Sequence, residues 1–178
     1  MQERLGYTGT LDSNGVQRIA AGLNTAVNGG YEEVHLCFSS MGGFGFVADG
    51  IYLYNHLRAL PIHTVVHNIG SVSSIAVAAF VGADERYCSA YSMFLIHPTT
   101  IGGAEMAAER LQSSLDAALA DDKRTESILR ERTGLPDKLL SARRRKEVHI
   151  TPDVALEYGL VHGIQEFSLP KGHEIIQI

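Results

Sequence analysis

Apolar residues along the chain follow helical spacing in some segments and form short continuous runs in others. Between Ser13 and Gly29-Gly30 they recur every three or four residues, which predicts an amphipathic helix that the glycines end. The run 34–38 predicts a buried strand, and a helix over 47–57 and a strand over 62–69 follow it. This alternation predicts an α/β fold of layered helices and parallel strands, with active-site loops at the carboxyl ends of the strands.

Three of these strand ends carry small or reactive residues. A glycine-rich turn contains Gly42-Gly43, the turn 70–75 leads Ser74 into a short apolar helix, and the strand 93–96 ends at His97. A serine at a helix N-terminus and a histidine at a strand end suit a nucleophilic hydrolase. The unpaired N–H groups at the helix N-terminus can stabilise the oxyanion that forms when the serine attacks a carbonyl. Turns of Gly and Ser before core helices are also common, so the spacing alone leaves a purely structural role for Ser74 open.

The second half of the chain is expected to be mostly helical. Apolar residues on one side of the segment 105–132 predict one long helix, longer than a small core needs, which would project and pair with another subunit. Pro136 opens a further helix to about residue 145, and Thr151-Pro152 starts a short one. A last strand is expected near 160–165, and the tail 167–178 suggests no function.

Composition and charge limit the possible partners. With 178 residues and 45% apolar content, the chain is expected to form one domain over 1–178 with a substantial core. The net charge of −5 argues against a nucleic-acid partner. The N-terminus lacks the apolar core of a signal peptide, and no apolar run approaches the roughly 18 residues of a membrane span. We therefore expect a cytoplasmic protein with no membrane partner.

The cysteines and paired histidines do not predict a metal site. Cys37 and Cys88 lie in apolar runs, which predicts two buried, reduced thiols rather than a disulfide or a nucleophile. His63 and His67 would share one face of a strand, but two histidines without a third ligand are more often ordinary side chains than a metal site. We therefore expect no metal and no cofactor.

Four segments, taken in order, resemble the proteolytic subunit of the Clp protease, a ClpP-like serine peptidase of the crotonase-like superfamily. The segment 40–43 resembles that family's Ser-Pro-Gly-Gly turn, and 70–75 resembles its Gly-x-x-x-Ser-Met nucleophile turn. The segment 94–98 resembles the strand that carries its histidine, and 151–161 resembles its Glu-Tyr-Gly-Leu-Val/Ile segment. The resemblance covers about residues 4 to 166.

The resemblance implies a set of site residues and an assembly. Ser74 would be the nucleophile, His97 the general base, and the backbone N–H groups of Gly43 and Ile75 the oxyanion hole. The protein would be a serine endopeptidase that hydrolyses peptides or unfolded proteins inside a chamber. That chamber would be formed by a homo-oligomer of stacked rings that meet through the long helix.

The chain departs from the family at the third catalytic position. Counted from Thr133-Gly134 or back from Thr151, the place of the triad aspartate holds Arg143, and a cation cannot accept the imidazole N–H. Losing that acid typically lowers the rate by on the order of ten-thousandfold. Glu147, Asp153 or a backbone carbonyl are the candidate replacements. We expect Arg143→Asp to raise activity or leave it unchanged.

The chain also differs from the family in one turn and at its N-terminus. The turn 44–48 is longer than the family's by about two residues, which bears on substrate pairing. The family's extended N-terminal segment, which contacts the ATPase ring, is expected to be missing, which counts against an AAA+ unfoldase partner.

The rival functions are a catalytically weak or degenerate subunit with an assembly or regulatory role, and a crotonase-type acyl-CoA enzyme, whose fold and paired oxyanion amides are the same.

Overall fold

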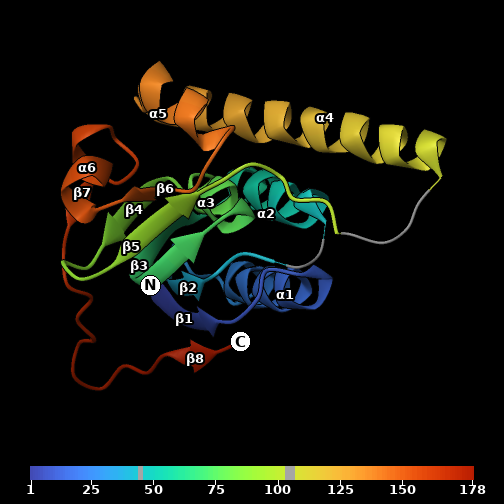
Figure 1. The fold of residues 1–178 in the computed structure, drawn as a ribbon. Helices are drawn as coiled ribbons and strands as arrows, with labels where there is room; N and C mark the ends of the chain where they lie inside the picture. The colour runs from blue at the N-terminus through green and yellow to red at the C-terminus, as the bar shows by residue number, and fades with distance from the viewer. Residues whose placement is uncertain (44–45, 103–106) are drawn as a thin grey trace.

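The computed structural model describes residues 1–43, 46–102 and 107–178, and these residues form one mostly parallel sheet flanked by helices (Figure 1). The strands are β1 Gln2–Thr8, β2 Glu33–Ser40, β3 His63–Ser73, β4 Glu85–Cys88, β5 Met93–Ile96, β6 Val148–Ile150, β7 Gly163–Ile164 and β8 Ile176–Gln177. The helices are α1 Ser13–Asn28, α2 Val47–Ala59, α3 Ile75–Phe80, α4 Ala108–Arg132, α5 Asp137–Arg143 and α6 Pro152–Glu157. The predicted α/β fold of layered helices and parallel strands is confirmed.

The sheet branches at β3, its longest strand. The main order is β6-β5-β3-β2-β1-β8, while β4 pairs with the first half of β3 and β7 pairs with β4. The end of β3, residues 71–73, pairs instead with β5. All pairs are parallel except β5 with β6. The carboxyl ends of β2, β3 and β5 therefore lie side by side at the same end of the sheet, because these strands are parallel.

The two faces of the sheet have different coverings. Leu5 on β1 points towards α1, whose N-terminus is capped by Asp12 accepting from the N–H of Gly15. Arg4 points the opposite way because side chains alternate along a strand, and there it contacts His173 of the C-terminal segment. The same segment adds β8 to the edge of β1, so residues 167–178, for which the sequence suggested no role, cover one face and one edge of the sheet.

Helix α4 crosses one end of the sheet and reaches beyond it, as Figure 1 shows. Its C-terminal half is anchored in the core by Ile128 and Leu129, whereas Leu111, Leu115 and Leu119 in its projecting half are exposed. The predicted long, projecting helix is confirmed from Ala108 onward, and its expected start at residue 105 lies outside the described residues, as do positions 44–45 of the altered turn. Pairing with another subunit remains a prediction.

Most predicted elements lie within a few residues of their expected bounds. The helix from Ser13 and the strand over 93–96 are confirmed, while the predicted strand over 62–69 continues to Ser73 because its last residues pair with β5. The last predicted strand is shorter, Gly163–Ile164, because only these two residues pair with β4. Among the described residues, no helix is both long and apolar enough to cross a membrane, and no three His, Cys, Asp or Glu side chains are grouped as a metal ligand set.

Candidate active site

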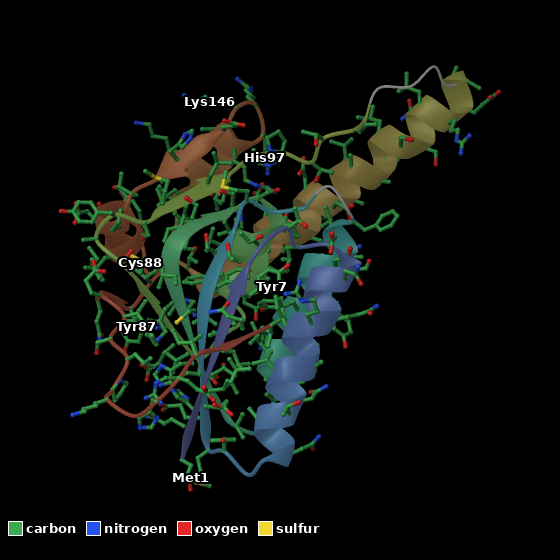
Figure 2. All side chains as sticks on the ribbon, turned by 90° about the horizontal axis from the view of Figure 1, so that it is seen from below. Met1, Tyr7, Tyr87, Cys88, His97 and Lys146 are labelled. Atoms are coloured by element: carbon green, nitrogen blue, oxygen red, sulfur yellow. The ribbon has the colours of Figure 1, made fainter. Side chains whose placement is uncertain are left out.

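A cavity of about 260 Å³ opens where the ends of β2, β3 and β5 meet α4 and α5. Ser74, His97, Gly43 and Ile75, the four site residues implied by the sequence, all line it, and so does Arg143. Figure 2 shows His97 at the end of the sheet that α4 crosses. The fold therefore brings together, from three separate strand ends, the four residues that the resemblance implies.

Ser74 forms the turn between β3 and α3 and has an unusual backbone conformation. Its φ of 59° and ψ of −132° make it the one residue other than glycine with a positive φ in the described parts of the chain. Its N–H donates a hydrogen bond of 2.7 Å to the carbonyl oxygen of Leu95, which holds Ser74 against β5. Strained strand-to-helix turns of this kind present the nucleophilic serines of α/β-hydrolases.

The neighbouring Ser73 has a different environment. It is the last residue of β3, only 4% exposed, and its hydroxyl donates to the sulfur of Met41. Ser74 lines the cavity whereas Ser73 does not. Sequence spacing could not separate these two serines without the family resemblance, but the backbone at Ser74 distinguishes them.

The glycine pair after β2 runs alongside Ser74. Gly42 has a φ of +87°, and a Cβ atom at this position would lie 2.6 Å from the Cβ of Ser74. The Gly42 carbonyl accepts the N–H of Leu11 at 2.9 Å, which holds the turn in place. Ile75 is the first residue of α3, so its N–H has no acceptor within the helix. Gly43 and Ile75 both line the cavity, so their N–H groups are candidates to hold an oxyanion.

His97 is oriented by a main-chain carbonyl. Its Nδ1 lies 2.6 Å from the carbonyl oxygen of Pro98. Because a carbonyl only accepts hydrogen bonds, this contact assigns the proton to Nδ1 and leaves the Nε2 lone pair free to take a proton. In the described residues no hydrogen bond joins His97 to Ser74, and such bonds are often long in unliganded sites and tighten when substrate binds.

Arg143 does occupy a wall of the site, but its charge is paired. It is 5% exposed, donates to Thr125 Oγ1 at 2.6 Å, and lies 3.4 Å from Asp122 Oδ1. Burial lowers the pKa of Arg143, while the Asp122 and Glu126 carboxylates act in the opposite direction. Glu147 and Asp153, the candidate acidic replacements, are exposed and do not line the cavity.

Asp122 is the residue that sequence reasoning missed. From α4 its Oδ1 accepts the backbone N–H of Thr99 at 2.7 Å and the Thr99 hydroxyl at 2.9 Å. One signal was present: Asp122 lies on the same helix side as Ala118, Thr125 and Leu129, all buried, where an unpaired carboxylate would be unfavourable. An acidic residue on the buried side of a helix indicates a hydrogen-bond partner in the segment packed against that side. Here that segment is the one that follows His97.

The two cysteines do not compete with Ser74 as nucleophiles. Both are free and buried, as predicted. Burial raises the pKa of the Cys37 thiol to about 11 and also raises that of Cys88. Since the thiolate is the reactive form, burial makes both side chains less reactive.

Sequence similarity to known proteins points to one family. The family model described as Clp protease matches residues 2–167. The ATP-dependent Clp protease proteolytic subunit of Paracoccus denitrificans is 28% identical over 157 residues, which cover 86% of this chain and 76% of that protein. The ATP-dependent Clp protease proteolytic subunit 2 of Pseudomonas aeruginosa is 24% identical over 169 residues, 92% of this chain and 83% of that protein. With a match over nearly its whole length, the chain belongs to the Clp protease family.

Proposed function

We propose that this protein is a serine endopeptidase subunit that hydrolyses peptides or unfolded proteins through Ser74 and His97. The observation that carries the proposal is the strained turn at Ser74, which shares one cavity with His97, whose Nδ1 lies 2.6 Å from the main-chain carbonyl oxygen of Pro98. Family membership supports the same reaction class.

The reaction follows from the placement of these groups. The Ser74 hydroxyl attacks the scissile carbonyl carbon while His97 Nε2 takes its proton. The N–H groups of Gly43 and Ile75 donate to the oxygen as negative charge develops on it. His97 then gives the proton to the leaving amine, and a water molecule, deprotonated by the same nitrogen, hydrolyses the acyl-enzyme.

The assembly is part of the proposal. The leucines on the projecting half of α4 form an apolar stripe that the described parts of the chain leave exposed, which suits an interface with a second copy. We propose a homo-oligomer of stacked rings that meet through α4 and enclose the active sites. Both relatives are named as ATP-dependent, which favours an ATPase partner that delivers substrate, in contrast to the sequence-based expectation against an AAA+ unfoldase.

Peptide hydrolysis tests this function. Purified protein is incubated with a set of fluorogenic peptides and with unfolded casein, alongside Ser74→Ala, His97→Ala and the control Ser73→Ala. We expect hydrolysis by the wild-type protein and by Ser73→Ala, and none by the other two. A folded, assembled wild-type protein that cleaves nothing would favour the degenerate subunit, and specific acyl-CoA binding would favour the crotonase-type enzyme.

A further inference from the structure

The carbonyl that orients His97 and the N–H that Asp122 holds belong to one peptide group. The carbonyl of Pro98 accepts from His97 Nδ1 at 2.6 Å, and the N–H of Thr99 donates to Asp122 Oδ1 at 2.7 Å. This peptide, like every other in the described residues, is trans, so its C=O and N–H point in opposite directions in one rigid plane. The imidazole and the carboxylate thus lie on opposite sides of a single amide.

We propose that Asp122 serves in place of the missing triad acid and acts on His97 through the Pro98–Thr99 peptide. The proposal rests on the proposed function, because it concerns the same histidine. Asp122 is a positioning residue here: its carboxylate contacts the peptide and Arg143, and it does not contact the imidazole.

Two physical effects connect the carboxylate to the ring. A carboxylate that accepts an amide N–H polarises the amide, which places more negative charge on its carbonyl oxygen and strengthens the bond from His97 Nδ1. The same oxygen also accepts the Thr99 hydroxyl at 2.9 Å, and this second bond fixes the orientation of the peptide plane. Both effects favour the Nδ1-protonated ring and stabilise the imidazolium that forms when Ser74 attacks.

Arg143 completes the arrangement from the other side. Its Nη2 lies 3.4 Å from the same Oδ1 atom, and its Nη1 reaches the main-chain carbonyl of Asp122 at 3.5 Å. The guanidinium therefore holds Asp122 in place. Arg143 lies where the sequence suggested a lost acid, but it supports an acid supplied by α4.

The expected effect is smaller than that of a direct triad acid. Loss of a triad aspartate that touches the histidine lowers the rate by about ten-thousandfold, and a relay through an amide carries only part of this. We expect Asp122→Ala to slow the reaction of Ser74 with a fluorophosphonate by about 10- to 100-fold. Asp122→Asn, which keeps an acceptor and loses the charge, should fall between this variant and the wild type.

The experiment measures two quantities on the full-length protein. One is the second-order rate of fluorophosphonate labelling. The other is the ¹⁵N spectrum of the His97 ring at alkaline pH, assigned by comparison with His97→Gln, which reports which nitrogen carries the proton. Asp121→Ala is the matched control, because Asp121 is the preceding residue of α4 and pairs with Arg124 at 3.4 Å rather than with Thr99. We expect an Nδ1-protonated ring in the wild type and in the control, and a mixture of tautomers in Asp122→Ala.

Two further variants separate the relay from other effects. Thr99→Val removes the hydroxyl bond but leaves the Asp122–Arg143 pair, so it should slow labelling even if Asp122→Ala does not fold. The double variant Asp122→Ala/Arg143→Ala removes both charges, and slow labelling should persist. Recovery to the wild-type rate in the double variant would assign the loss to the unpaired Arg143 and overturn the proposal.

The outcomes also separate this proposal from the proposed function. Wild-type rates and an unchanged tautomer in the Asp122 and Thr99 variants would overturn the relay and leave the peptidase standing. A wild-type protein that no fluorophosphonate labels would overturn the peptidase, whereas the ¹⁵N spectra would still show whether Asp122 orients His97.

Discussion

The close approach of Gly42 to Ser74 gives a sharp test of the site geometry through the variant Gly42→Ala. The new Cβ would lie 2.6 Å from the Cβ of Ser74 and 2.9 Å from the carbonyl oxygen of Ser73. Carbon atoms in contact are about 3.5–4.0 Å apart, so one of the two turns must move by about 1 Å. A displacement of that size at a catalytic group costs about 100-fold in rate.

The same substitution also strains the backbone, and this contribution can be measured separately. Gly42 has a φ of +87°, where a residue with a side chain costs about 1–2 kcal/mol. Gly30 has a φ of +75° at the end of α1, and a Cβ there would meet nothing within 4 Å. Gly30→Ala therefore carries the backbone strain without the clash, and it is the matched control.

Fluorophosphonate labelling rates and urea unfolding measure the two effects. Both variants should lose about 1–2 kcal/mol of unfolding free energy, with a further loss in Gly42→Ala from the clash. Only Gly42→Ala should label about 100-fold more slowly than the wild type. Labelling of Gly42→Ala at the wild-type rate would show that the glycine turn does not adjoin the reactive serine.

Three further predictions concern other parts of the chain. Arg143→Asp should lower the labelling rate and cost about 3 kcal/mol in urea unfolding, because it breaks a buried ion pair and sets a second carboxylate beside Asp122; faster labelling would contradict this. Burial, and to a smaller extent the His35 ring, lower the pKa of His67 to about 4. Between about pH 6.5 and pH 4 this side chain is therefore protonated in the unfolded chain but not in the native state. Stability should therefore fall by about 3 kcal/mol as the pH drops through that window, and the fall should be smaller by this amount in His67→Phe; equal slopes would contradict it. Leu115→Asp on α4 should reduce the mass of the assembly in sedimentation while the subunit stays folded, and an unchanged mass would place the contact elsewhere.

The sequence predicted the elements better than the contacts between them. Periodicity located α1, β5 and most of α4, because each has a strong local pattern over its own length. β6 and β8 were not predicted, because these strands of three and two residues are defined by their pairing with β5 and β1 rather than by a local pattern. Their pairing depends on where distant segments dock.

The sequence predicted Ser74 and His97 but not Asp122, which holds the segment after His97. Ser74 and His97 stand out as residues at turn and strand ends, and the family spacing selects Ser74 over Ser73. Asp122 lies 23 residues after Thr99, and their contact depends on how α4 crosses the sheet, which no local pattern encodes. For the same reason the expectation that Arg143→Asp would raise activity or leave it unchanged was made without the partners of Arg143. Because Arg143 contacts Thr125 and Asp122, we now expect this substitution to lower the labelling rate.

Mapping the site of fluorophosphonate modification shows whether Ser74 is the nucleophile. The purified protein is treated with the reagent, digested, and analysed by tandem mass spectrometry, with Ser74→Ala, Ser73→Ala and His97→Ala treated in parallel. We predict a single adduct on Ser74 in the wild type and in Ser73→Ala, no adduct in Ser74→Ala, and a strongly slowed reaction in His97→Ala. An adduct on Ser73, or no modified serine in a folded and assembled protein, would contradict the account.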